Sequence, residues 1–209
     1  YTDFSVRMYD VDAVGNDSVW AVGYITSPSA SRTSKIYRST DGGQNWSTYS
    51  GIPVGVNGQY LSDIEFPTHL IGYAAGTRDT IWKTTDGGVT WNKLPLPFPG
   101  VTPQISYTDM FALDANTIFL TGNGFPRKVV IKTTDGGATW TDISNNITTL
   151  GGGNLNGIVM HGVDNGYVVS PGGYLFKTND GGANWTLDLA PIGTIFTSMA
   201  FAPKKVPAA

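Results

Sequence analysis

Residues 84–91 read Thr-Thr-Asp-Gly-Gly-Val-Thr-Trp, and three near copies of this octapeptide occur elsewhere in the 209-residue chain. The copies share an aspartate, a glycine two positions on and a tryptophan five positions on: Asp41, Gly43, Trp46; Asp86, Gly88, Trp91; Asp135, Gly137, Trp140; and Asp180, Gly182, Trp185. Successive aspartates are 45, 49 and 45 residues apart, a period typical of propeller blades rather than of ankyrin or tetratricopeptide units. The chain is therefore a repeat protein.

The chemistry of the octapeptide predicts a tight hairpin. An alternating apolar segment precedes each copy and a tryptophan follows it, so the chain reverses direction at Asp-Gly-Gly. The glycines can adopt positive φ, and the aspartate can accept hydrogen bonds from turn N–H groups. We expect the indole to cover those bonds from the returning strand. Because the motif recurs in every repeat, we expect it to be structural and not an active site.

Composition favours an all-β protein and excludes several kinds of site. The chain has 27 glycines, a single glutamate (Glu65) and a net charge of −3, which gives no electrostatic basis for binding nucleic acid. It has no cysteine, and His69 and His161 lie in different repeats, so we predict no disulfide, metal or cofactor. No apolar run approaches the ~20 residues of a membrane-spanning helix.

Each repeat contains four strand-like runs, which predicts a β-propeller of four-stranded blades. We place the blades at about 5–50, 59–95, 104–144 and 153–188, and the first strand of a further blade at 194–202, within one propeller domain or segment over 1–209. The chain begins at Tyr1, so we expect a processed form or a fragment. Our hypothesis is a segment of a longer propeller, or an array that self-associates through its unpaired terminal blades. Direct packing of blade 1 on blade 4 would contradict it.

With the four copies in register, the chain resembles the Asp-box (BNR) repeat proteins. The run Lys-Thr-Thr-Asp-Gly-Gly-x-Thr-Trp in repeats 2 and 3 is most similar to the bacterial and plastid propellers related to the photosystem II stability and assembly factor (YCF48-like). Asp boxes also occur in sialidases, xyloglucanase-type glycoside hydrolases and sortilin-like receptors, on blade hairpins away from the binding face. The resemblance therefore implies a propeller fold and a structural role for the Asp boxes.

Cations near one end of the blades are the candidate binding residues. In a propeller, the loops that join second to third strands share one face with the inter-blade loops, and four cations fall there: Arg32, Arg78, Arg127 and Lys128. Arginine forks suit carboxylates or phosphates, so this face could bind an acidic protein segment or an anionic glycan. The alternative is that these are ordinary solvated loop charges.

Three aspartates are the candidate catalytic residues, because Asp10, Asp63 and Asp109 occupy equivalent positions in the first strands of blades 1 to 3. A carboxylate pair could perform glycosidic acid–base chemistry or contribute to a Ca²⁺ site. The alternative is a repeated hydrogen-bonding role in the architecture, which repetition favours. An arginine triad with a Tyr–Glu pair, as in sialidases, is not recognisable.

We therefore expect a non-catalytic propeller that serves as a binding or assembly platform for a protein or glycan, located outside the cytoplasm. The first alternative is part of a xyloglucanase-like glycoside hydrolase. The second is a structural subunit, secreted or on the cell surface.

Overall fold

The structure is a computed structural model that describes residues 5–26, 32–49, 59–98, 104–124, 127–147 and 154–189. These residues form sixteen strands in four antiparallel sheets of four strands each, and no helix. The all-β class and the four-stranded blades predicted from the repeat are thereby confirmed. The predicted strand at 194–202 lies outside the described residues.

Each sheet is one blade, with its strands in sequential order from the inside outwards. Blade 1 comprises β1 (Ser5–Val14), β2 (Ser18–Thr26), β3 (Arg32–Ser39) and β4 (Ser47–Tyr49). Blade 2 comprises β5 (Leu61–Glu65), β6 (Gly72–Gly76), β7 (Thr80–Thr84) and β8 (Asn92–Lys93). Blade 3 comprises β9 (Ser106–Ala112), β10 (Ile118–Gly124), β11 (Arg127–Thr133) and β12 (Thr141–Asp142). Blade 4 comprises β13 (Gly157–His161), β14 (Asn165–Ser170), β15 (Tyr174–Thr178) and β16 (Thr186–Leu189).

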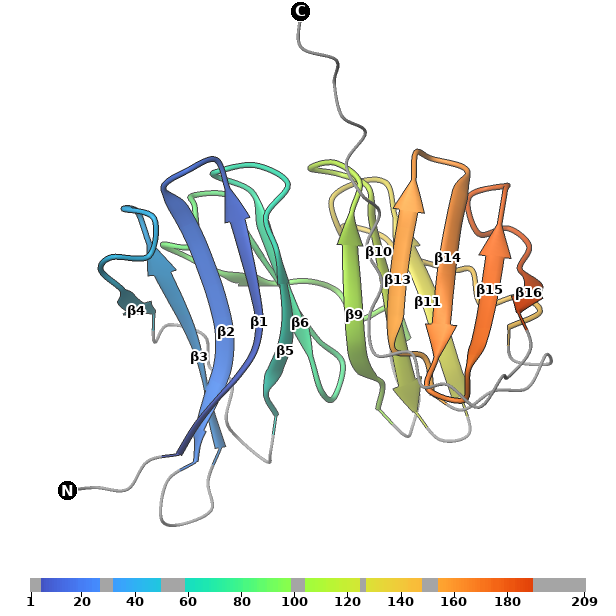
Figure 1. Ribbon diagram of the computed structural model, residues 1–209, viewed down its shortest axis with the longest axis horizontal. Coiled ribbons are helices and arrows are strands. Elements are labelled where there is room, and N and C mark those ends of the chain that lie inside the picture. The colour runs from blue at the N-terminus through green and yellow to red at the C-terminus, as the bar shows by residue number, and fades with distance from the viewer. Residues whose placement is uncertain are drawn as a thin grey trace, which may run out of the picture.

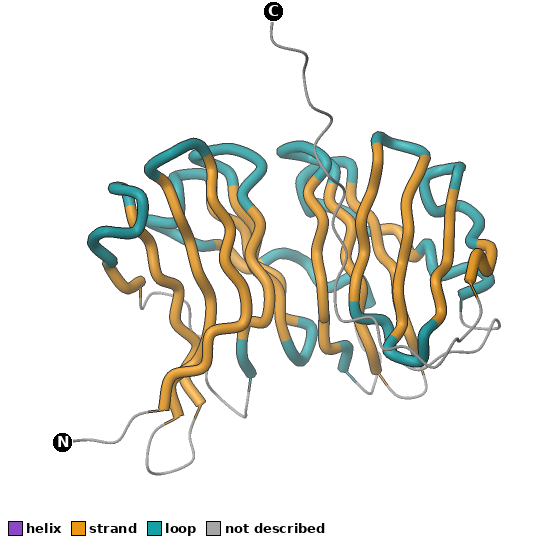
Figure 2. Tube along the Cα trace, viewed as in Figure 1, coloured by secondary structure: helices purple, strands orange, loops and turns teal. Residues whose placement is uncertain are grey.

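The blades stand side by side with their strands nearly parallel to one direction, so that turns collect at the two ends of the molecule (Figures 1 and 2). The Asp-box turns and the turns between the first and second strands share one end. There, Gly42, Gly87, Gly136 and Gly181 each donate a backbone hydrogen bond to the preceding turn of the same blade. We call this the Asp-box end, and the other the opposite end.

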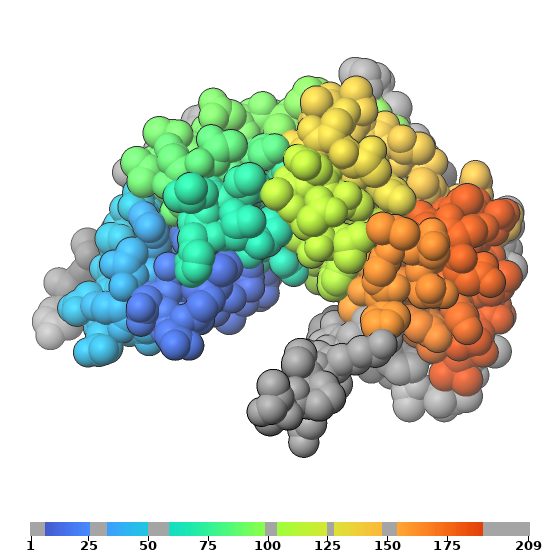
Figure 3. Space-filling view, turned by 90° about the horizontal axis from the view of Figure 1, so that it is seen from above, coloured from blue at the N-terminus to red at the C-terminus, as the bar shows by residue number. Residues whose placement is uncertain are grey.

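Seen from above, the four blades form an arc (Figure 3). The inner strands β1, β5, β9 and β13 contact one another in that order. The described residues of blade 1 and blade 4 lie at the two extremities of the arc, with an opening between them. This arrangement is a partial propeller, in agreement with the expectation that four blades do not close directly on themselves.

The core lies between blades, in three hydrophobic clusters. In each cluster, a surface of one blade meets a surface of the next blade along the chain. We call the surface that faces the next blade the trailing face, and the surface that faces the preceding blade the leading face. Trp20, Val22 and Ile36 of blade 1 pack on Ile64, Ala74 and Trp82 of blade 2. Tyr73, Ala75 and Ile81 of blade 2 pack on Met110, Leu120 and Ile131 of blade 3. Phe119 and Val130 of blade 3 pack on Ile158, Val168 and Phe176 of blade 4. Stacking of repeats, and not any single blade, therefore buries the apolar surface.

Candidate functional site

The Asp-box aspartates hold their own turns. One Asp86 oxygen accepts hydrogen bonds from the Thr84 hydroxyl and the Thr90 N–H, both at 2.8 Å, and the other accepts from the Thr90 hydroxyl at 2.6 Å. These bonds, with the Thr90 hydroxyl first, lower the pKa of Asp86 to about 2. The other three boxes repeat this pattern around Asp41, Asp135 and Asp180. The second glycine of the box, Gly88, has a φ of 91°, a conformation that side chains with a Cβ avoid.

The four tryptophans do not share one environment, unlike the uniform cover that the sequence predicts. Trp46 donates to the Gly43 carbonyl at 2.9 Å but is 46% exposed. Trp185 is 1% exposed and instead donates to the carbonyl of Ile143, in the preceding blade, at 2.8 Å. The exposure of each indole depends on where its blade stands in the arc. Each indole packs against the blade before its own, and the described residues provide no such blade for Trp46.

A basic side chain stands three residues before each Asp-box aspartate, and that of Lys83 ties neighbouring blades together. Lys83 lies over the Tyr73 ring, with its Nζ 5.2 Å from the centroid, and donates to the carbonyl of Gly136 in the next blade at 2.9 Å. Equivalent ring contacts are Arg38 over Trp20, Lys132 over Phe119 and Lys177 over Tyr167. Lys83 therefore serves the inter-blade architecture, and the other three cations make the same kind of ring contact within their own blades.

The candidate binding cations lie at the opposite end, as the topology predicts. Arg32 and Arg127 are the first residues of β3 and β11, and their side chains lie outside the described part. Lys128 is half-buried, and burial lowers its pKa. Arg78 is exposed, in the turn between β6 and β7. Its φ of 59° is unusual for a residue other than glycine.

The next residue, Asp79, anchors the Arg78 turn to blade 3. Its N–H donates to the Ile105 carbonyl at 2.8 Å, and its carboxylate accepts from the Ile105 N–H at 3.1 Å. Asp79 also has a positive φ, 56°. Backbone strain of this kind persists only where surrounding contacts hold it, so the Asp79 contacts fix the backbone of the turn that carries Arg78.

The three first-strand aspartates meet on the inner strands. Asp63 is 5% exposed and hydrogen-bonds with Asp10 and Asp109. One oxygen of Asp10 accepts from the Ile64 N–H at 3.0 Å, and one oxygen of Asp109 accepts from the Ile158 N–H at 2.6 Å. Two of the three carboxylates therefore bridge consecutive inner strands, a role that does not depend on catalysis.

Burial and mutual repulsion keep protons on this carboxyl cluster. Burial, followed by the negative charges of Asp109 and Asp10, raises the pKa of Asp63 well above its ordinary value. Burial raises the pKa of Asp109 to about 6. Burial, with the charges of Asp12 and Asp10, raises the pKa of Glu65 to about 8. Among the described residues, no group of His, Asp or Glu side chains is arranged to hold a metal ion.

A β-bulge interrupts the inner strand of each of the first three blades at the same place. The pairing registers shift at Tyr9, Ser62 and Thr108, directly before the three aspartates. In blade 4 the equivalent residue is Asn156, and the pairs from Gly157 to His161 are regular. Bulges re-aim side chains and are enriched beside functional sites. Here the bulged residues Tyr9, Ser62 and Thr108 line one pocket together with Asn156 of blade 4.

This pocket, which we call the channel groove, has a volume of about 340 Å³ and extends across β1, β5 and β9 to the residue just before β13. It is lined by aromatic and hydroxyl or amide side chains: Tyr9, Tyr60, Ser62, Thr77, Ser106, Tyr107, Thr108 and Asn156. The rings of Tyr9 and Tyr60 stack at 5.3 Å, and Tyr24 packs against both. Thr77 directly precedes Arg78 in the chain, which places that exposed cation beside the groove lining.

Sequence reasoning missed the channel groove. Its signal was present, since the position before the aligned aspartates, or before Gly157 in blade 4, carries Tyr, Ser, Thr and Asn. Two of these hydroxyls also bridge blades: Ser62 donates to the Tyr107 carbonyl at 2.9 Å and Thr108 to the Leu155 carbonyl at 2.8 Å. Within the described ranges, no helix has the length and apolar character needed to cross a membrane.

Comparison with models of protein families identifies the family to which the chain belongs. The family model described as photosynthesis system II assembly factor YCF48 matches residues 47–199, more than half of the chain. The chain belongs to this family. A BNR/Asp-box repeat model also matches, at residues 37–48. No curated protein sequence matches the chain.

Solved structures of the YCF48 family share the fold. YCF48 bound to a D1 peptide is 18% identical, with a TM-score of 0.68 over 97% of this chain and 62% of that one. YCF48 from Cyanidioschyzon merolae is 18% identical, with a TM-score of 0.65 over 95% and 61% of the two chains. The GH74 xyloglucanase from Xanthomonas campestris is 16% identical, with a TM-score of 0.57 over 78% and 26%. The chain thus spans about three fifths of the YCF48 chains and about a quarter of the xyloglucanase.

Proposed function

We propose that this protein is a non-catalytic assembly platform that holds an extended segment of a partner protein in the channel groove. The observation that carries the proposal is the groove itself, which three bulges at one register supply with polar and aromatic side chains from consecutive blades. Stacked tyrosines offer apolar area with little entropy to lose, and hydroxyl and amide groups can pair with a peptide backbone. The family membership and the D1 peptide bound to the YCF48 relative support a peptide as the ligand.

Arg78 is the residue we assign to the charged part of such a ligand. It is exposed beside the groove lining, and the Asp79 contacts hold its turn in a conformation that costs backbone energy. A guanidinium in this position can pair with a side-chain or terminal carboxylate. We assign Arg32, Arg127 and Lys128 to the same proposed face. The argument for these three residues is weaker, because it rests only on their position at that end of the blades.

The test is a titration of the chain with the D1 peptide of the solved YCF48 complex, followed by fluorescence anisotropy. We expect saturable binding that Tyr60→Ala and Arg78→Ala each weaken by about 10-fold. Lys177→Ala, which removes a cation at the Asp-box end, serves as the matched control and should leave binding unchanged. Absence of saturable binding, or equal effects of Arg78→Ala and Lys177→Ala, would contradict the proposal.

The alternative function is that of a glycoside hydrolase fragment, and the raised pKa values of Asp63 and Glu65 favour it. A carboxyl that keeps its proton near neutral pH can act as a general acid. Release of reducing sugar from xyloglucan, lost in both Asp63→Asn and Glu65→Gln, would support this alternative, whereas inactive wild-type protein would exclude it for this substrate. We retain a location outside the cytoplasm as a proposal, which cell fractionation with an antibody to the chain would test.

A further inference from the structure

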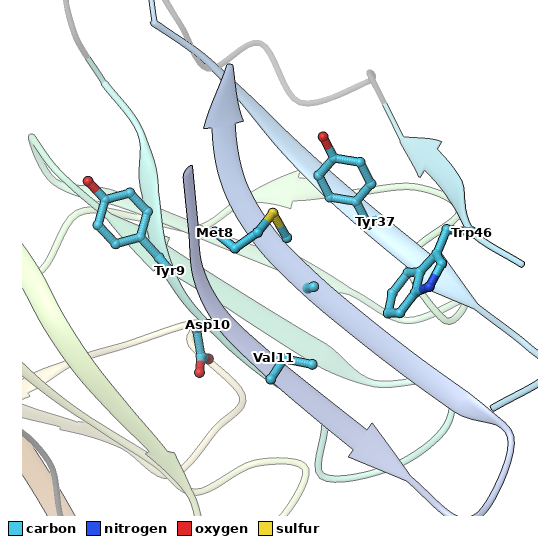
Figure 4. A pocket seen from close by; sticks show the side chains of 7 residues that line it. Met8, Tyr9, Asp10, Val11, Tyr37 and Trp46 are labelled. Atoms are coloured by element: carbon cyan, nitrogen blue, oxygen red, sulfur yellow. The ribbon is translucent and has the colours of Figure 1, made fainter. Parts of the chain in front are cut away.

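The channel groove and the carboxyl cluster are built on the same three inner strands. At each β-bulge a groove residue directly precedes an aspartate, in the pairs Tyr9 and Asp10, Ser62 and Asp63, and Thr108 and Asp109. Figure 4 shows Tyr9 and Asp10 on the same side of β1, opposite Met8. Because the two residues of each pair are consecutive, a strand that moves at its aspartate also moves at its groove residue.

Asp63 joins the inner strands of three blades through its carboxyl group. It is buried on β5 and hydrogen-bonds with Asp10 on β1 and with Asp109 on β9. Two carboxyl groups form such a bond only if one of them keeps a proton, because an ionised carboxylate has no hydrogen to donate. The outer two aspartates are held in place, since Asp10 also accepts from the Ile64 N–H and Asp109 from the Ile158 N–H. The protonated cluster therefore holds β1, β5 and β9 together.

The charges that act on Asp63 come from other carboxylates. The strands packed against β5 are β1, β2, β6 and β9, and neither β2 nor β6 carries a charged side chain. The charged neighbours on β1, β5 and β9 are Arg7, Asp10, Asp12, Glu65 and Asp109. Arg7 is exposed. The other titratable side chains of these strands are the tyrosines Tyr9, Tyr24, Tyr73 and Tyr107. Loss of the Asp63 proton would thus place like charges side by side in a buried site.

We propose that the carboxyl cluster sets the pH range in which the channel groove binds its ligand. The protonated cluster keeps the groove in shape, and the ionised cluster opens it and releases the ligand. This inference rests on the proposed function of the groove. Ionised Asp63 would repel Asp10 and Asp109 and push β1 and β9 away from β5. The stacked rings of Tyr9, on β1, and Tyr60, directly before β5, would then separate.

Binding should be strongest at low pH and weaken as pH rises. Burial, followed by the charges of Asp109 and Asp10, raises the pKa of Asp63 well above its ordinary value. Burial raises the pKa of Asp109 to about 6 and that of Glu65 to about 8. If only the protonated form binds, the affinity falls by up to about 10-fold for each pH unit above the pKa of the unliganded protein.

The first experiment titrates wild type and Asp63→Asn with the D1 peptide at pH 5, 6, 7 and 8, by fluorescence anisotropy. Asp63→Asn keeps a side-chain hydrogen-bond donor but cannot ionise. The ratio of the two dissociation constants at each pH cancels any titration of the peptide itself. We expect the wild-type constant to rise relative to that of Asp63→Asn, by up to about 10-fold per pH unit. Asp188→Asn, a change at an exposed carboxylate on β16, should keep the wild-type profile.

The second experiment observes the groove without a ligand. The Tyr9 and Tyr60 rings stack at 5.3 Å, which is close enough for a nuclear Overhauser effect between their protons. We expect this effect to weaken from pH 5 to pH 8 in the wild-type protein and to persist in Asp63→Asn. The stack of Tyr174 on Phe176 in blade 4 is the matched internal control and should persist in both proteins. Circular dichroism at each pH checks that both remain folded.

The two experiments separate this inference from the proposed function. Saturable binding with a ratio that stays constant over pH would overturn the inference and leave the proposed function intact. Absence of saturable binding at every pH would contradict the proposed function, and the ring contact would then decide the inference alone. A Tyr9–Tyr60 contact that is unchanged between pH 5 and pH 8, or that weakens equally in Asp63→Asn, would overturn it.

Discussion

The carboxyl cluster on the inner strands should make the protein less stable as pH rises, and Asp63→Asn should remove much of that dependence. The pKa of Asp63 is raised well above its ordinary value, chiefly by burial. The native state therefore keeps a proton that the unfolded chain releases above pH ~4. Such a group stabilises the native state at low pH, and its contribution is lost as pH rises towards the raised pKa.

The magnitude follows from the retained proton. Each pH unit between the ordinary and the raised pKa costs about 1.4 kcal/mol for one proton, so Asp63 lowers the stability by up to this amount for each pH unit below its raised pKa. Asp109, with a pKa of about 6, adds a loss of the same sign up to about pH 6. Glu65, with a pKa of about 8, extends the loss to about pH 8. Asparagine at position 63 keeps a hydrogen-bond donor between Asp10 and Asp109 but has no proton to lose.

Urea unfolding at pH 5, 6 and 7 measures the effect. We expect the free energy of unfolding of the wild-type protein to fall over this window, and that of Asp63→Asn to fall less steeply, by up to about 1.4 kcal/mol per pH unit. Asp188→Asn, a change at an exposed carboxylate on β16, should reproduce the wild-type slope. A wild-type stability that is flat or rises over this window, or an Asp63→Asn slope equal to wild type, would refute the assignment of these protons to the cluster.

Three further predictions concern the Asp-box end. Asp86→Ala should cost about 1–3 kcal/mol of stability, because the turn amide and hydroxyls lose their acceptor, while binding of the D1 peptide by folded protein stays unchanged. Lys83→Met should cost about 1–2 kcal/mol by removing the hydrogen bond to the next blade and the ring contact, whereas Lys93→Met on the exposed β8 should cost little in the same urea assay. Gly88→Ala should lower the melting temperature more than Gly162→Ala: both have positive φ, but only at Gly88 would the added Cβ meet another residue, the Trp20 indole at 3.2 Å.

The sequence predicts the blades well because an Asp box is local. The side-chain bonds around Asp86 join residues two and four positions apart, so Thr84, Asp86 and Thr90 make this interaction within one octapeptide. The number of Asp boxes therefore predicts the number of blades, and this prediction does not require knowing how the blades pack. The direction of the strands follows, and with it the prediction that Arg78 lies at the end opposite the Asp boxes.

The channel groove could not be predicted in the same way. Tyr9 and Tyr60 stack although they are 51 positions apart, and no local pattern records that contact. The three bulges are shifts of one residue in the pairing register between two strands. No residue in the sequence, such as a glycine, marks where these shifts occur. The aspartates were recognised by their repetition, but their meeting depends on the spacing between inner strands, which the sequence does not state.

The ties between blades have a consequence for how such proteins change over generations. Asp10 to Ile64, Ser62 to Tyr107 and Thr108 to Leu155 each connect one repeat to the next along the chain. A duplicated segment of one repeat would therefore carry both its forward ties and the backbone groups that pair with the repeat behind it. Gene duplication or deletion can add or remove a whole blade while every remaining junction stays chemically complete, which makes ring size an evolvable quantity in this architecture.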